Sequence, residues 1–194
     1  MFAYIEGKLT EKTPTHIVVD AQGVGYLMHI SLHSFEKFKM MDTARVLVHF
    51  IVREDAQILY GFADEDERKL FRLLISVSGV GANTARILLS SLHPSELVTA
   101  ISSGNEGLLK KVKGIGAKTA QRIIVDLRDK VLKESGISGN LDISYNTRRE
   151  EALSGLVVLG FGKVEAEKAL SKIQQQMGIE LPVEQLIREA LKIL

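Results

Sequence analysis

The 194-residue sequence predicts an α+β protein of several domains, with a β-rich N-terminal third and helices after it. Three observations support this fold class. Five short runs of β-branched and aromatic residues fill the N-terminal third, one helical unit is written twice in the middle, and a Ser/Gly/Asn-rich stretch precedes a helical tail. We therefore expect domains at 1–63, 64–134 and 148–194, with a flexible linker at 135–147.

The predicted strands are FAYIEGKLTE, THIVVDA, VGYLMHISL, ARVLVHFIV and AQILYGF, and HSFEKF is a short helical insertion between the third and the fourth. Five short strands with a helical insertion are typical of a closed or nearly closed barrel of the OB type. The last two strands are joined by Arg53-Glu54-Asp55-Ala56. Taken by itself, this tetrapeptide is typical of a polar hairpin tip.

The duplicated unit occupies Leu73–Leu92 and Leu108–Leu127, and the two copies, offset by 35 residues, are identical at 9 of 20 positions. In each copy a leucine-rich helix ends, a Gly-apolar-Gly turn follows, and a second helix begins. The free N–H groups at the start of that second helix predict a phosphate site that needs no particular side chain. The pattern resembles the helix-hairpin-helix motif, which binds DNA backbone without reading sequence. The alternative is an ordinary pair of helical hairpins whose glycines are C-caps.

Charge is distributed unevenly, although the net charge is only +1. Residues 68–133 contain 12 basic and 4 acidic residues, whereas 1–63 contain 6 and 7, and 135–194 contain 7 and 8. The excess of positive charge therefore lies on the duplicated unit, as phosphate contacts would require. The predicted DNA-binding residues are Gly79, Val80, Gly81, Ala82, Asn83 and Thr84 in the first copy, and Lys110, Lys111, Lys113, Gly114, Ile115, Gly116, Ala117, Lys118, Thr119 and Arg122 in the second.

No catalytic or metal site is predicted, and no cofactor. The run Asp64-Glu65-Asp66-Glu67 offers carboxylates to a divalent metal, but such a run more often caps a helix, here one expected to begin near Arg68. The sequence contains no ATP-binding G-x-x-x-x-G-K-[ST] motif and no H-E-x-x-H motif, and its five histidines are dispersed.

Cysteine is absent, which excludes disulfides and cysteine-ligated zinc and fits a reducing compartment. The N-terminal MFAYIEGK does not resemble a signal peptide, and the longest strongly apolar segment, Val46–Val52, is too short to span a membrane. We therefore expect a cytoplasmic protein without a membrane partner.

The tail predicts three short amphipathic helices at Arg148–Leu159, Lys163–Met177 and Val183–Leu194. The turn between the first two contains Leu159-Gly160-Phe161-Gly162 and resembles the turn of ubiquitin-associated (UBA) three-helix domains, which bind partners through an apolar face. Leu159 and Phe161 are the candidate contacts for a protein partner. The alternative for Phe161 is a place in the core.

The order of these parts resembles the RuvA family, whose members recognise Holliday junctions in bacterial branch migration. The most specific matches are Val52–Ala56 continuing into Leu59–Phe62, Gly79–Gly81, and Gly114–Thr119. The resemblance implies a homotetramer that holds a four-way DNA junction open and square, with one tetramer or two facing tetramers on each junction. It also implies that Glu54 and Asp55 form an acidic pin near the four-fold axis.

The resemblance further implies a non-catalytic subunit in recombination, DNA repair and the SOS response. Its C-terminal domain would dock RuvB, the hexameric ATPase that acts in trans, and the RuvC resolvase would join the larger complex. Three other functions are compatible with parts of the sequence: a helix-hairpin-helix base-excision glycosylase, a general duplex-binding protein and a protein-binding adaptor. A glycosylase would require a single hairpin in a larger helical domain, and this chain has two hairpins.

Overall fold

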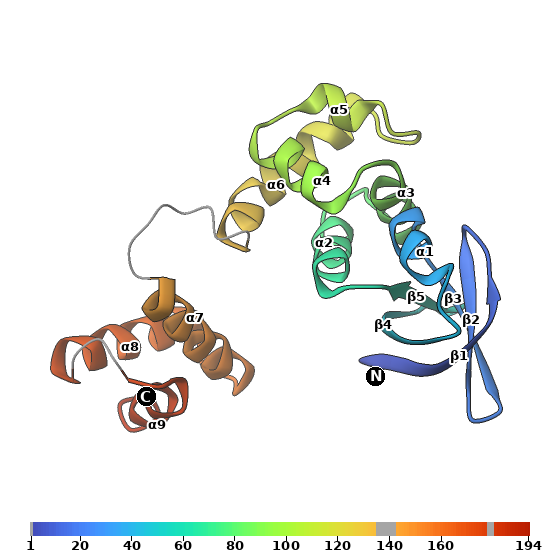
Figure 1. The fold of residues 1–194 in the computed structure, drawn as a ribbon. Helices are drawn as coiled ribbons and strands as arrows, with labels where there is room; N and C mark the ends of the chain where they lie inside the picture. The colour runs from blue at the N-terminus through green and yellow to red at the C-terminus, as the bar shows by residue number, and fades with distance from the viewer. Residues whose placement is uncertain (1, 135–142, 178–180) are drawn as a thin grey trace. The chain divides into compact units, whose positions relative to one another are not determined.

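The computed structural model describes residues 2–134, 143–177 and 181–194 (Figure 1). The chain forms two compact units, Met1–Ile137 and Ser138–Leu194. The first unit contains all the strands and the duplicated helices, and the second contains the helical tail. None of the described helices combines the length and the apolar character needed to cross a membrane.

Five strands form a closed barrel in the order β1-β2-β3-β5-β4, with β1 pairing β4 to complete the ring. The β3–β5 pair is parallel and the others are antiparallel. This arrangement confirms the predicted OB-type barrel. The elements are β1 (Tyr4–Lys12), β2 (His16–Ala21), β3 (Val24–His29), α1 (Leu32–Phe38), β4 (Thr43–Val52) and β5 (Gln57–Phe62).

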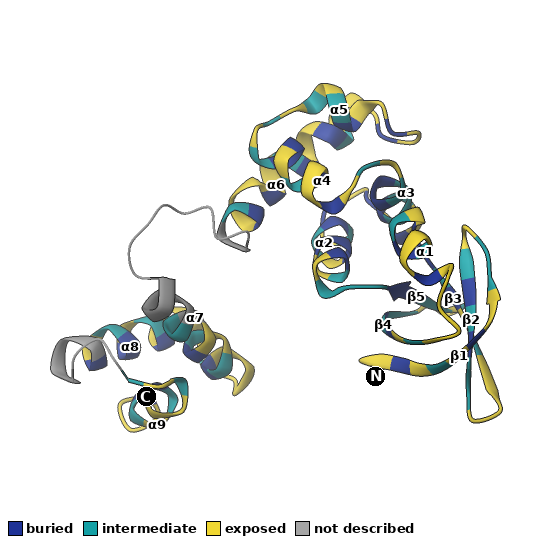
Figure 2. Ribbon diagram, in the orientation of Figure 1, coloured by how far each residue is buried: buried dark blue, intermediate teal, exposed yellow. Residues whose placement is uncertain are grey.

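Alternation along the strands directs one set of side chains into the barrel. Ile17, Val19, Met28, Val46 and Val48 have no exposed surface. Ile17 and Val19 on β2, and Val46 and Val48 on β4, are two positions apart, as expected when successive side chains point to opposite faces of a strand. The residues next to them along the strands are intermediate or exposed, and Figure 2 colours the strands by burial.

The remaining helices of the first unit are α2 (Glu65–Ile75), α3 (Ala82–Ser91), α4 (Pro94–Ser102), α5 (Glu106–Lys110) and α6 (Ala117–Glu134). Helix α2 begins three residues before the predicted start at Arg68. Asp64 is its N-cap, and its Oδ1 accepts a hydrogen bond of 2.8 Å from the Glu67 N–H. The acidic run is therefore the cap and the first turn of the helix, where negative charge offsets the helix dipole.

The barrel interior has a hydrophobic core of its own, and the helices of this unit form a second core that includes Tyr60 and Phe62 of β5. Phe71 of α2 is fully buried, and its ring centroid lies 5.0 Å from those of both Tyr60 and Phe62 on β5. His49 on β4 meets the same ring at 5.5 Å. Arg68 of α2 adds a hydrogen bond, which its Nη1 donates to the carbonyl oxygen of Ala3 at 2.7 Å. The orientation of α2 on the barrel is therefore determined by contacts on several strands.

A buried carboxylate joins α1 to α2. The Glu67 carboxylate, which has no exposed surface, accepts hydrogen bonds from the hydroxyls of Ser31 and, at 2.5 Å, Ser34. Ser34 Oγ in turn accepts the Ala63 N–H at 2.8 Å. Burial raises the pKa of the Glu67 carboxyl, while the two serine hydrogen bonds act in the opposite direction. We call Ser31, Ser34, Asp64 and Glu67 the α1–α2 joint.

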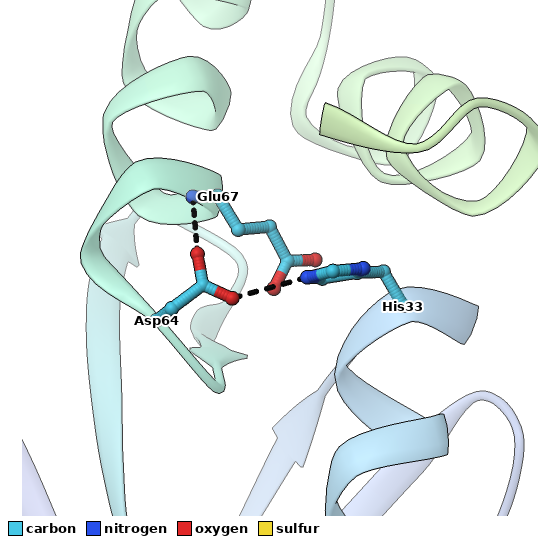
Figure 3. Close-up of side chains that lie close together, drawn as sticks. All are labelled: His33, Asp64 and Glu67. Atoms are coloured by element: carbon cyan, nitrogen blue, oxygen red, sulfur yellow. Dashed lines mark hydrogen bonds and ion pairs between the residues drawn. The ribbon is translucent and has the colours of Figure 1, made fainter. Parts of the chain in front are cut away.

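Asp64 is the half-buried carboxylate of this joint (Figure 3). Its Oδ2 accepts hydrogen bonds from His33 Nε2 at 3.0 Å and from Lys37 Nζ at 2.7 Å. Burial alone would raise the pKa of Asp64, but the hydrogen bonds from Lys37, the Glu67 amide and His33 lower it from 3.8 to about 2. The ionised carboxylate is therefore the form that the fold stabilises.

The second unit is a bundle of α7 (Ile143–Val158), α8 (Lys163–Met177) and α9 (Val183–Ala190). All three predicted helices are present, but α7 begins five residues before Arg148, inside the predicted linker. Extending an existing helix costs little compared with starting one, so weak helix formers such as Ser144 and Thr147 are accommodated. The other predicted linker residues, 135–142, lie outside the described residues.

The core of this bundle is small. Ala152 and Leu156 of α7, Ala166 of α8 and Ala190 of α9 have no exposed surface. Alanines at the contacts allow the helices to approach closely. Figure 2 shows buried positions on each of the three helices.

We expect Gly7→Ala to lower the free energy of unfolding by about 2 kcal/mol or more, because the added methyl group would overpack the barrel. A Cβ at Gly7 would lie 2.1 Å from the backbone oxygen of Asp20 on the neighbouring strand. Gly25→Ala is the matched control on β3, because its nearest heavy atom, Val18 Cγ1, lies at 3.5 Å. Urea unfolding of the full chain measures both, and equal stability of the two variants would contradict the packing described here.

We expect Asp64→Asn to remove about 2 kcal/mol of stability at pH 7, since each unit of pKa depression corresponds to about 1.4 kcal/mol. Because the pKa of Asp64 is lowered in the fold, this contribution is complete above about pH 4 and is lost as the pH falls toward 2. The gap between wild type and variant in urea unfolding should therefore close over that range. Asp66→Asn, an exposed change in the same turn, is the control. A gap that does not depend on pH would contradict the assignment.

Candidate nucleic-acid interface

The first Gly-apolar-Gly turn joins α2 to α3. Gly79 has φ +88°, in the region that favours glycine, and Gly81 is the N-cap of α3. No side chain caps this helix, so its first N–H groups are available to an external acceptor. Val80, only 4% exposed, points into the core, and its N–H donates to the Val77 carbonyl at 3.0 Å. The turn thus presents backbone outward and an apolar anchor inward.

The second turn, between α5 and α6, repeats this backbone. Gly114 has φ +93°, and Ile115 is 6% exposed and donates its N–H to the Val112 carbonyl at 3.1 Å. The first regular bond of each following helix also matches: Ala85 to Gly81 and Ala120 to Gly116 are both 2.9 Å. The duplication is therefore one of backbone conformation, and both turns expose a helix N-terminus suited to an anion.

Burial divides the predicted DNA-binding residues into two groups. The side chains of Val80, Ala82 and Ile115 are buried, so these residues offer a ligand only their backbone. The glycines of both turns also offer only their backbone, because glycine has no side chain. Thr84 and Thr119 are half-buried. The exposed side chains are those of Asn83, Lys110, Lys111, Lys113, Ala117, Lys118 and Arg122.

Positive charge surrounds the second turn. Lys110, Lys111, Lys113 and Lys118 are all exposed, and no ion pair within the described parts of the chain engages them. Their ammonium groups are therefore available to phosphates. The first turn has no lysine at the equivalent positions, which are Ile75, Ser76, Ser78 and Asn83, so it can offer a phosphate mainly its backbone N–H groups.

Two arginines near the turns are bound to backbone carbonyls. Arg122, which we predicted to bind DNA, donates from Nη1 to the Ser78 carbonyl at 3.0 Å. Arg86 of α3 donates to the carbonyl of Ile30 at 3.3 Å and to Asn83 Oδ1 at 2.9 Å. Sequence reasoning missed Arg86 because nothing near it in the chain indicates a contact with residues of the barrel.

Glu54 and Asp55 lie at the tip of the β4–β5 hairpin. A hydrogen bond of 2.8 Å from the Arg53 N–H to the Ala56 carbonyl closes the turn around them. Both side chains are exposed, and no ion pair among the described residues neutralises them. The hairpin therefore presents two uncompensated carboxylates on the same unit that contains the basic turns.

His33, Asp64 and Glu67 are the described residues whose ligand atoms could converge on a metal ion, since these atoms lie within 4.8 Å of one another (Figure 3). These ligand atoms, however, already form hydrogen bonds within the protein. Asp64 accepts hydrogen bonds from Lys37, His33 and the Glu67 amide, and Glu67 accepts them from two serines. The Lys37 ammonium already supplies the positive charge beside Asp64. The arrangement is that of a structural joint.

In the second unit, the two predicted partner contacts, Leu159 and Phe161, differ in exposure. Gly160 has φ +100°, its N–H donates to the Val157 carbonyl, and the Phe161 N–H donates to the Leu156 carbonyl, which together form a Schellman C-cap of α7. Phe161 is half-buried and packs against the bundle core. Leu159, in contrast, is 59% exposed.

Apolar residues near this turn extend the exposed surface around Leu159. Val158 is 84% exposed and Val164, in the first turn of α8, is 62% exposed. We call Val158, Leu159 and Val164 the α7–α8 apolar surface. Several exposed aliphatic side chains in so small a domain are typical of a protein interaction site.

Models of known protein families match three parts of the chain. Residues 1–61 match the RuvA N terminal domain, 71–129 match the SAM-like helix-hairpin-helix tandem, and 147–194 match the RuvA C-terminal domain.

Full-length relatives carry the name Holliday junction branch migration complex subunit RuvA. Those of Flavobacterium psychrophilum and Christiangramia forsetii are each 48% identical over 192 residues, covering 99% of both chains. The relative from Parabacteroides distasonis is 48% identical over 197 residues, covering 100% of both chains. With this identity along its whole length, and with the same order of domains, the chain belongs to the RuvA family.

Proposed function

We propose that this protein recognises four-way DNA junctions and acts as the junction-binding subunit of a branch-migration complex whose ATPase is a separate protein. The observation that carries the proposal is the pairing of two exposed helix-hairpin-helix turns with an exposed acidic hairpin on one compact unit. The first feature attracts DNA backbone and the second repels it. A protein with both features selects DNA by shape and charge distribution.

The two turns would hold one duplex arm by its phosphates. Exposed N–H groups at the start of α3 and α6 would bind phosphate oxygens, and the lysines near Gly114 would add a salt-dependent attraction. Contacts of this kind position a duplex and carry no information on its base sequence. Sequence independence suits a junction that moves along DNA.

Glu54 and Asp55 would lie at the centre of the junction in a homotetramer, as the family resemblance implies. Four copies would bring eight carboxylates to the point where the strands exchange. Repulsion between these carboxylates and the phosphates would favour an open crossover and disfavour a continuous duplex across the centre. One tetramer or two facing tetramers would satisfy this geometry.

The second unit would dock the motor. RuvB, the ATPase implied by the family resemblance, would bind the α7–α8 apolar surface, and the RuvC resolvase would act on the same junction. Leu159 remains a candidate contact, whereas Phe161 would act indirectly by supporting the turn. These activities belong to recombination and repair of DNA, and we infer a cytoplasmic location from them.

Gel shifts of a four-way junction and of a linear duplex with equal arm length, over a salt series with magnesium, test the proposal. We expect wild type to prefer the junction strongly. Glu54→Lys/Asp55→Lys should raise duplex affinity by about tenfold at low salt and reduce the preference, because repulsion becomes attraction.

Glu6→Lys/Asp42→Lys is the matched control, since both carboxylates are exposed on the barrel outside this hairpin. The control makes the same change in charge and should preserve the preference for the junction. Equal affinity of wild type for junction and duplex would overturn the proposed function.

We expect Leu159→Asp to abolish stimulation of the ATPase while junction affinity stays within about twofold of wild type, since a buried charge at a protein interface is costly. Ser154→Asp, an exposed change on α7, is the control and should retain stimulation. The measurement is ATP hydrolysis by the motor with junction DNA. Full stimulation by Leu159→Asp would exclude this residue from the docking surface.

A further inference from the structure

The geometry points to Arg122 as a positioning residue that fixes the spacing between the two DNA-binding turns. Its Nη1 donates to the carbonyl of Ser78, the residue before Gly79, at 3.0 Å. A Cβ at Gly79 would lie 4.0 Å from the same nitrogen. The guanidinium of the second hairpin thus lies directly beside the turn of the first. This inference rests on the proposed function.

The contact joins the two phosphate sites by a short path. Ser78 precedes Gly79 in the first turn, and Arg122 lies in the second turn of α6, whose first residue, Ala117, follows the second glycine turn. The Ser78 carbonyl lies just beyond the C-terminal end of α2, where a cation is favourable. A charged donor on this carbonyl gives a stronger bond than a neutral one.

The two copies differ at the positions that form the Arg122–Ser78 hydrogen bond. The residue equivalent to Arg122 in the first copy is Ile87, and the residue equivalent to Ser78 in the second copy is Lys113. The second copy therefore donates this hydrogen bond to the first, whereas the isoleucine side chain of the first copy has no donor for the equivalent bond. Arg86, whose equivalent is Gln121, binds the barrel instead, through the carbonyls of Ile30 and Thr15. Arg86 thus attaches the first hairpin to the barrel, and Arg122 attaches the second hairpin to the first.

Spacing matters because phosphates along a duplex are themselves at fixed distances. If the two turns move relative to each other, binding one arm must first order them, and this cost reduces affinity. A preformed pair avoids the cost. The charge of Arg122 therefore acts within the protein, whereas Lys118, exposed near the second turn, acts on phosphate.

Junction binding across a salt series separates these two roles. Arg122→Lys keeps the charge but loses the guanidinium geometry, so we expect about three- to tenfold weaker binding with an unchanged salt slope. Lys118→Ala should reduce the slope by about one. Arg128→Lys, on the same helix, is the matched control and should bind as wild type does. Wild-type affinity of Arg122→Lys, or a slope reduced by one in Arg122→Gln, would overturn the inference.

A distance measurement provides a second readout that does not depend on binding. The sequence has no cysteine, so Ser91→Cys and Gln121→Cys place spin labels only on α3 and α6, at exposed positions. Labelled chains diluted into unlabelled ones report the distance within one subunit. Arg122→Lys should broaden the distance distribution without DNA, and junction DNA should narrow it again.

An unchanged distribution in Arg122→Lys would contradict the positioning role even if its affinity fell. The proposed function fails separately, if wild type itself does not prefer the junction. Thermal unfolding of each variant, with a midpoint within a few degrees of wild type, confirms that the fold is retained.

Discussion

The burial of one face of α2 against the barrel is the contact on which the first unit depends. Phe71 packs against Tyr60 and Phe62, and Glu67 accepts hydrogen bonds from the hydroxyls of Ser31 and Ser34 at the start of α1. A buried carboxylate is stable only when its oxygens are hydrogen-bonded, so this joint tolerates little displacement. Because α2 leads directly into the first glycine turn, the same contacts place that turn relative to the barrel and its acidic hairpin.

This placement brings opposite charges onto one compact unit without pairing them. The lysines near the second turn and the carboxylates of Glu54 and Asp55 are all exposed and form no ion pairs among the described residues. A net charge of +1 therefore conceals a surface with attractive and repulsive regions. In the proposed function, attraction holds the arms while repulsion selects an open centre, and neither would suffice for junction preference.

The two hairpins show which features a duplication keeps and which it changes. The glycines with positive φ, the apolar anchors Val80 and Ile115, and the backbone hydrogen bonds are repeated. The arginines are not repeated, because each copy packs against a different neighbour. Repetition of the turn within the chain would preserve the proposed phosphate site, while the changed arginines give each copy its own attachment.

Features that arise from interactions between neighbouring residues could be predicted from the amino-acid sequence. Strand alternation predicted the barrel, and the paired glycine turns predicted the hairpins. These features depend on neighbouring residues, and the sequence displays neighbours directly. Element boundaries were less accurate, since α2 begins at Glu65 and α7 at Ile143. Helix ends depend on capping partners and on tertiary contacts that stabilise weak helix formers.

Which side chains are available for binding depends instead on contacts between residues far apart in the chain. Arg122 contacts a carbonyl 44 residues away, Glu67 contacts hydroxyls 33 and 36 residues away, and Phe161 packs against the bundle core. No local sequence pattern distinguishes an arginine that binds phosphate from an arginine that binds a backbone carbonyl, because the side chain is the same in both cases. The distinction depends on what the fold brings within hydrogen-bonding distance, and that is a property of the packed chain.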